Sequence, residues 1–166
     1  MKVTCVKTSL AVLACAAVVM GDSGSRSFKA KLSGFQEVPT VSTQATGEFR
    51  ARINSAGTEI AYELEYSGLE GSVLASHVHL GARGVAGGVM FFLCGGGSAP
   101  ACPASGKVTG TVTATDVIGP AAQGIAPGEF AEALRALRAG MTYANVHSTK
   151  FPGGEIRGQI KDEDDD

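Results

Sequence analysis

The chain has 166 residues, with 14 Lys and Arg against 16 Asp and Glu, and it carries a formal net charge of −2. The charge is unevenly spread, because residues 22–160 hold 11 basic and 11 acidic residues whereas residues 161–166 hold one Lys and five acidic residues. The lack of a basic stripe in the sequence argues against a nucleic-acid-binding protein, and the acidic end is typical of a disordered, solvated tail.

The first 23 residues have the layout of a secretory signal peptide, with a basic start and an apolar run over residues 10–20. This run is too short for a membrane-spanning helix, which needs about 20 residues. We therefore expect no transmembrane segment, cleavage within residues 21–27, and a secreted or periplasmic protein. A lipoprotein signal anchored at Cys15 is the alternative, although the residues that follow Cys15 remain apolar.

Beyond residue 27 the sequence is mostly a series of short strands separated by turns. In most of these runs apolar and polar residues alternate with period 2, as in half-buried strands. The predicted strands cover residues 28–32, 48–53, 59–66, 76–80, 89–93, 108–113, 143–148 and 155–160. They predict a single domain of about 140 residues, folded as an antiparallel β-sandwich of the Greek-key, immunoglobulin-like or superoxide-dismutase-like kind.

One segment departs from the strand pattern. Phe130, Leu134, Leu137 and Met141 recur at helical spacing, with charged residues on the other faces. A proline near the start and a glycine after the end are helix boundary signals. We predict one short amphipathic helix near residues 128–139 that packs on the domain.

Two cysteines, Cys94 and Cys102, flank a short loop rich in glycine. In an exported protein such a pair predicts a disulfide, which the loop-entropy model values at about 2–3 kcal/mol. The alternative is a pair of free thiols that help to bind a metal, but their loop offers no third ligand.

The sequence contains only three histidines, and all of them fall in two of the predicted strands. His77 and His79 are two residues apart, so their side chains point to one face of a strand, about 7 Å apart. His147 shares a face of the other strand with Tyr143 and Asn145. If the two strands are neighbours, three imidazoles converge, which is the minimum ligand set for a copper or zinc site.

Three further side chains are candidates to complete such a site, as a ligand or as a hydrogen-bond partner of a ligand. They are Asn145, Glu155 and Met90. The alternatives to a metal site are a structural network, in which the imidazoles hydrogen-bond only to backbone or carboxylate groups, and a contact patch for another ligand. A separation of more than about 10 Å between His147 and the other histidines would exclude the metal site, because ligand bonds are about 2.0–2.1 Å long.

Sequence signatures of catalysis are lacking, so we predict no catalytic residues and no organic cofactor. The chain has no G-x-S-x-G nucleophile elbow. The glycine-rich residues 81–88 contain no Walker lysine and do not lead from a strand into a helix, and they are interpreted as a flexible connection.

Three motifs occur in a fixed order along the chain. They are residues 28–39 (FKAKLSGFQEVP), 76–81 (SHVHLG), and 143–148 (YANVHS) followed by 151–160 (FPGGEIRGQI). Together they resemble the chordin-type domain, CHRD, over about residues 28–160. Thr40 stands where the family often has a second proline, and the loop between the two cysteines is similar to a local insertion.

The resemblance implies that the chain folds as a domain of this family, but it does not imply any particular reaction. The family occurs as repeated modules in chordin, an extracellular antagonist of growth factors of the bone-morphogenetic type, and as single-domain exported proteins of bacteria. This free-standing domain is similar to the bacterial kind, so growth-factor binding is not transferred to it. We expect an exported, non-enzymatic binding or structural module whose partner is an extracellular or periplasmic protein or matrix.

The alternative function is that of a copper-handling protein or metalloenzyme with His77, His79 and His147 as direct metal ligands. The H-x-H strand resembles that of copper/zinc superoxide dismutase, another exported β-sandwich. That enzyme needs six or more histidines for its two metals, so the three histidines of this chain exclude a dismutase of that type.

Overall fold

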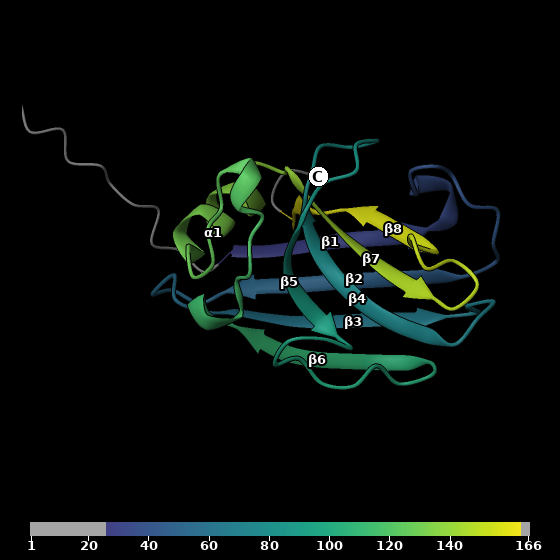
Figure 1. The fold of residues 1–166 in the computed structure, drawn as a ribbon. Helices are drawn as coiled ribbons and strands as arrows, with labels where there is room; N and C mark the ends of the chain where they lie inside the picture. Colours follow the sequence, from purple (N-terminus) through teal and green to yellow (C-terminus); the bar gives the residue numbers. More distant parts are fainter. Residues whose placement is uncertain (1–25, 164–166) are drawn as a thin grey trace, which may run out of the picture.

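The computed structural model describes residues 26–163, so the expected signal peptide, Cys15 and the last three acidic residues lie outside the described part of the chain. Within it, nine strands are accompanied by one α-helix and three single-turn 3-10 helices (Figure 1). The elements are β1 (Arg26–Ser33), η1 (Gly34–Gln36), β2 (Thr46–Ile53), β3 (Ile60–Ser67), β4 (Val73–Leu80), β5 (Val89–Cys94), β6 (Gly106–Val112), η2 (Ala114–Asp116), η3 (Ala121–Gln123), α1 (Phe130–Arg138), β7 (Thr142–Ser148), β8 (Ile156–Gln159) and β9 (Lys161–Asp162).

All strand pairs are antiparallel, and the strands form one sheet in the order β5-β4-β7-β8-β1-β2-β3-β6, with β9 added beside β1. The sheet folds over itself, so that β4, β5 and β7 cross in front of β1, β2 and β3 (Figure 1). The predicted antiparallel sandwich with one short helix is therefore confirmed, in the form of a single sheet that nearly closes into a barrel.

Alternation of side chains explains how this sheet buries its core. In β3, Ile60, Tyr62, Leu64 and Tyr66 are at most 6% exposed, while the residues between them face outward. Burial of each large apolar side chain contributes about 1.5–3 kcal/mol. A slip of one residue in register would expose the whole apolar set, so the pattern fixes the pairing of the strand.

Tyrosine hydroxyls and the disulfide close the seam where the two ends of the sheet approach each other. Tyr62 donates a hydrogen bond of 2.6 Å to the carbonyl oxygen of Leu93 on β5, although the two strands are not neighbours in the sheet. The predicted disulfide between Cys94 and Cys102 is confirmed, and it ties the end of β5 to the loop before β6. The seam thereby anchors the outer edge of the sheet half that contains β4 and β7.

The predicted helix is present as α1, and it buries Phe130, Ala133, Leu134 and Leu137. The expectation that Met141 continues this apolar face is wrong, since Met141 is 47% exposed. The helix ends at Arg138, and Gly140, with φ of +67°, turns the chain away before Met141 is reached. No helix in the described part of the chain is long and apolar enough to cross a membrane.

The ordered domain extends slightly past its expected end at residue 160. Lys161 and Asp162 pair with β1 as strand β9, and Asp162 is 5% exposed. Its carboxylate lies 3.3 Å from Nε of Arg26. These two residues therefore do not belong to a solvated tail, because the charge of Asp162 has a partner on the neighbouring strand.

Candidate metal centre

Neighbouring strands bring the three histidines together. β4 pairs with β7, with His77 opposite Asn145 and Ala75 opposite His147. Val78 and the apolar residues of β7 face the core, so the period-2 alternation turns His77, His79 and His147 to the outer face of the sheet. The expectation that the two histidine-bearing strands are neighbours is confirmed.

The histidine side chains converge closely. One ring nitrogen from each of the three residues lies within 4.8 Å of those of the other two. Nδ1 of His77 is 3.1 Å from Nε2 of His147. Two neighbouring nitrogens bound to one metal at 2.0–2.1 Å are about 2.8–3.0 Å apart in square geometry and about 3.3–3.4 Å apart in tetrahedral geometry. The spacing of His77 and His147 therefore suits a shared metal. The 4.8 Å span of the three nitrogens exceeds the maximum of about 4.2 Å between two ligands of one metal, so a bound metal would have to draw the rings slightly together. The separation of more than about 10 Å that would have excluded a metal site is not found.

Two backbone carbonyls set the tautomers of His79 and His147. Nδ1 of His79 is 2.9 Å from the carbonyl oxygen of Gly87, and Nδ1 of His147 is 3.0 Å from that of Pro152. A carbonyl oxygen only accepts hydrogen bonds, so each Nδ1 must donate its proton. In a neutral imidazole this leaves Nε2 with a lone pair, which is the form that binds metals. In the metal-free protein the lone pair of His147 Nε2 faces Nδ1 of His77 at 3.1 Å and accepts its hydrogen bond.

All three imidazoles are held in the neutral form. Burial lowers the pKa of His77 to about 3, with further contributions from His147 and His79. Burial also lowers the pKa of His79 and of His147. At neutral pH the cluster therefore presents lone pairs and not positive charges.

The interior of the cluster is rich in acceptors. Nε2 of His147 lies 2.9 Å from Oδ1 of Asn145 as well as 3.1 Å from His77. Nε2 of His79 is buried and makes no hydrogen bond of ordinary geometry among the described residues, although the nearby Asn145 side chain acts on the pKa of this ring as a hydrogen-bond partner. A buried polar atom without a partner costs about 1–3 kcal/mol, so the cluster is an arrangement that a bound cation would stabilise.

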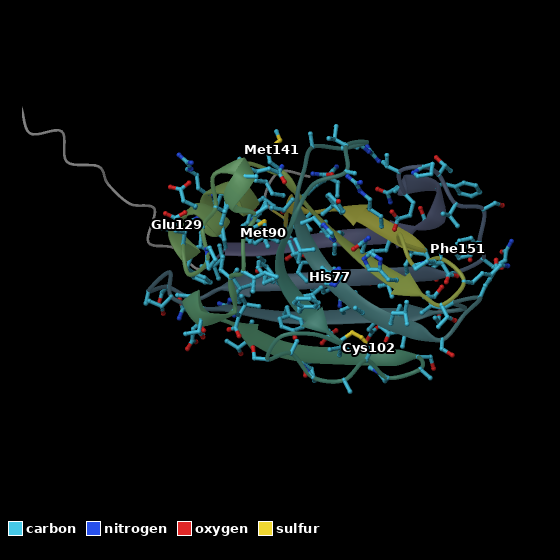
Figure 2. All side chains as sticks on the ribbon, in the orientation of Figure 1. His77, Met90, Cys102, Glu129, Met141 and Phe151 are labelled. Carbon is cyan, nitrogen blue, oxygen red and sulfur yellow. A yellow bond between two sulfur atoms is a disulfide. The ribbon has the colours of Figure 1, made fainter. Side chains whose placement is uncertain are left out.

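Of the three auxiliary candidates, the structure brings only Asn145 to the histidines. Glu155 is fully buried, but its carboxylate accepts hydrogen bonds from the Thr43 hydroxyl at 2.9 Å and the Glu70 backbone N–H at 2.8 Å. Glu155 therefore holds together the two loops that contain Thr43 and Glu70. Met90 is buried in the hydrophobic core, at 0% exposure, and it lies at some distance from His77 (Figure 2).

Aromatic rings support the histidines from both sides. The Tyr143 ring stacks on His79, with centroids 4.7 Å apart and an interplanar angle of 4°. Phe92 of β5 meets His77 edge to face at 4.5 Å. Sequence reasoning placed Tyr143 on the correct face, but it missed Phe92 because the continuously apolar run of β5 does not show which side chains face outward.

Two buried side chains of opposite charge, Arg157 and Glu37, line one pocket beside this cluster. Arg157 is 2% exposed, and its guanidinium carbon lies 3.3 Å from the Tyr143 ring centroid. Its NH2 group donates to the carbonyl oxygens of Ala82 and Val85. Glu37, 6% exposed, is the opposite charge that Arg157 interacts with electrostatically. Glu37 was not among the predicted site residues, since it lies in a turn without periodicity.

This arrangement defines an antiparallel β-sandwich domain with a three-histidine cluster on its outer face. The family model described as "CHRD domain" matches residues 28–160. The chain therefore belongs to the CHRD domain family, as its three motifs suggested. No curated protein and no solved structure matches it.

Proposed function

We propose that this protein is an exported, non-enzymatic CHRD module that binds Cu(II) or Zn(II) through His77, His79 and His147. The observation that carries the proposal is the convergence of the histidines, in which one ring nitrogen of each lies within 4.8 Å of the other two, around a buried Nε2 of His79 that makes no hydrogen bond of ordinary geometry. Neutral imidazole suits both metals.

A purely structural network is a weaker account of the same residues. Such a network would pair every buried nitrogen, because an unpaired one destabilises the fold. The backbone carbonyls of Gly87 and Pro152 instead fix His79 and His147 with their lone pairs directed away from the backbone. Outer hydrogen bonds of this kind orient ligands in known metal sites.

Asn145 is the candidate for a fourth ligand. Its Oδ1 lies 2.9 Å from Nε2 of His147, which is close to the spacing of two ligands on one metal, about 3 Å. Its side chain is almost fully buried, at 3% exposure for the residue, so its position is fixed by packing.

The disulfide supports the export part of the proposal. Cys94 is fully buried and bonded to Cys102. Disulfides form and persist in oxidising compartments, such as the extracellular space and the periplasm. A partner in that compartment, a protein or a matrix component, belongs to the same proposal.

Metal analysis of the purified domain tests the proposal. The wild type and the His77→Ala/His79→Ala variant are incubated with Cu(II) or Zn(II), passed through a desalting column and analysed for metal. We expect near-stoichiometric metal on the wild type and almost none on a variant that keeps its circular dichroism spectrum. A variant with Asp164, Asp165 and Asp166 changed to Asn controls for binding to the acidic end, and it should match the wild type.

The opposite result has a clear meaning. A wild type that retains no metal, together with a double variant that unfolds at lower temperature, would show that the histidines have a structural role. The proposal would then be wrong.

A further inference from the structure

The carboxyl group of Glu37 lies so close to Gly154 that only a glycine, which has no Cβ, fits at position 154. Oε1 of Glu37 is buried and makes no hydrogen bond of ordinary geometry within the described chain, while the Asn145 amide and the Val38 backbone N–H are the donors that act on its carboxyl group. A Cβ at Gly154 would lie 2.6 Å from this oxygen and 2.9 Å from Nδ2 of Asn145. The glycine, with φ of +130°, thus lets the Glu37 carboxyl and the Asn145 amide approach the same point. Glu37 therefore lies next to the residue that contacts His147.

A permanent positive charge lies on the same face of the sheet. Arg157 stands opposite Asn145 in the sheet, and Asn145 stands opposite His77. The guanidinium lies on the Tyr143 ring, and that ring stacks on His79. The charge of Arg157 acts on His79 and contributes to its lowered pKa. An uncompensated Arg157 would repel a dication bound to the three neutral imidazoles.

We propose that Glu37 is the counter-charge of the metal centre: its carboxylate cancels the charge of Arg157, so that a divalent cation can bind among neutral ligands. This inference rests on the proposed metal-binding function. Glu37 is a charge-balancing residue in this account and not a ligand, since the ring nitrogens of the histidines form the only cluster of potential ligands found in the described residues.

The competing account gives Glu37 a structural role only. Arg157 holds the connection between β4 and β5 through the carbonyl oxygens of Ala82 and Val85, and Glu37 would simply stabilise Arg157 in that position. Loss of Glu37 would then disorder the site and lower the affinity for every cation by the same factor. An electrostatic role is different, because the interaction energy is proportional to the charge of the bound cation.

Cation charge therefore separates the two accounts. Zn(II) and Ag(I) affinities are measured by competition with chromogenic chelators in nitrate buffer, for the wild type, Glu37→Gln, Glu37→Asp and Glu48→Gln. The pH is 8, because burial raises the pKa of Glu37 to about 7 and the carboxyl is mostly ionised above it. Glu48 lies on β2, away from the histidines, and its variant makes the same change in net charge.

We expect Glu37→Gln to weaken Zn(II) binding by about 10–100-fold, the usual effect of losing an outer partner of a metal site. The loss for Ag(I) should be about 3–10-fold, since half the charge halves the logarithm of the effect. Glu37→Asp, which keeps the charge, should stay within about threefold of the wild type for both cations, and Glu48→Gln should leave both affinities unchanged.

Other outcomes overturn the inference in distinguishable ways. Equal losses for Zn(II) and Ag(I), or no loss, on a wild type that binds both would reject the charge-balancing role alone. A wild type that binds neither cation would reject the proposed function as well. If Glu37→Gln does not fold, Glu37→Asp decides, and a folded Glu37→Asp with a tenfold or larger loss for Zn(II) would count against the inference.

Discussion

Single ring nitrogens determine what the histidine cluster is able to bind. Because Gly87 and Pro152 offer carbonyl oxygens to Nδ1 of His79 and His147, both rings should be neutral Nδ1–H tautomers in the metal-free protein at pH 7.5. Long-range ¹⁵N–¹H correlation spectra in the presence of EDTA distinguish the two tautomers. Nε2–H forms, or rapid exchange between tautomers, would contradict the assigned lone pairs.

The metal-free protein should lose stability in acid through His77. Its pKa falls from 6.5 in the unfolded chain to about 3 in the folded protein. Between these two pH values only the unfolded state takes up a proton at His77. The stability that neutral His77 contributes is therefore fully present above pH 6.5 and is lost as the pH falls toward 3. Allowing for partial solvent screening, the loss at pH 5 is on the order of 1 kcal/mol.

Comparison with a variant isolates this effect. Burial raises the pKa of Glu37 from 4.5 to about 7, so its contribution has the opposite sign and declines as the pH rises through that window. Urea unfolding at pH 5 and pH 7.5 should therefore be compared between the wild type and His77→Asn, both in EDTA. The wild type should lose more stability on acidification, and equal losses would contradict the lowered pKa of His77.

At the scale of an element, the connection between β7 and β8 shapes the site. It supplies the Pro152 carbonyl to His147, and its Gly154 leaves room for the carboxyl of Glu37. Gly154→Ala should destabilise the protein by about 1–3 kcal/mol, because it combines a positive φ with a clash. It should also weaken metal binding.

The adjacent glycine provides a matched control. A Cβ at Gly153 would meet no atom within 4 Å, and its φ is not in the left-handed region. Gly153→Ala should therefore change the free energy of unfolding by no more than about 0.5 kcal/mol. Chemical denaturation of both variants measures the difference, and equal effects would show that the position of Glu37 does not depend on Gly154.

Elements were more predictable than their contacts. Period-2 alternation correctly placed strands such as β3, and helical spacing located α1. Met141 was misassigned because the same spacing continues past the glycine that ends the helix. The acidic composition of the chain end obscured β9, whose Asp162 is stabilised by Arg26, a residue distant in sequence.

At the scale of the whole molecule, long-range pairing makes the site. The contact between His77 and His147 joins residues 70 positions apart, and no local propensity specifies such a pairing. The sequence predicted that the three histidines and Asn145 lie close together, and the structure places them so; that they bind a metal stays a proposal. The sequence could not rank Asn145 above Glu155 and Met90, or reveal the role of Glu37, because these distinctions depend on which loops fold over the sheet.

X-ray absorption at the zinc edge of the Zn(II)-loaded domain is the most direct test of the central claim that three histidines share one metal. The account predicts three imidazole ligands at about 2.0–2.1 Å, with an oxygen ligand at about 2.0–2.2 Å. A spectrum with oxygen ligands only, without the multiple scattering of imidazole rings, would place the metal elsewhere and contradict the account.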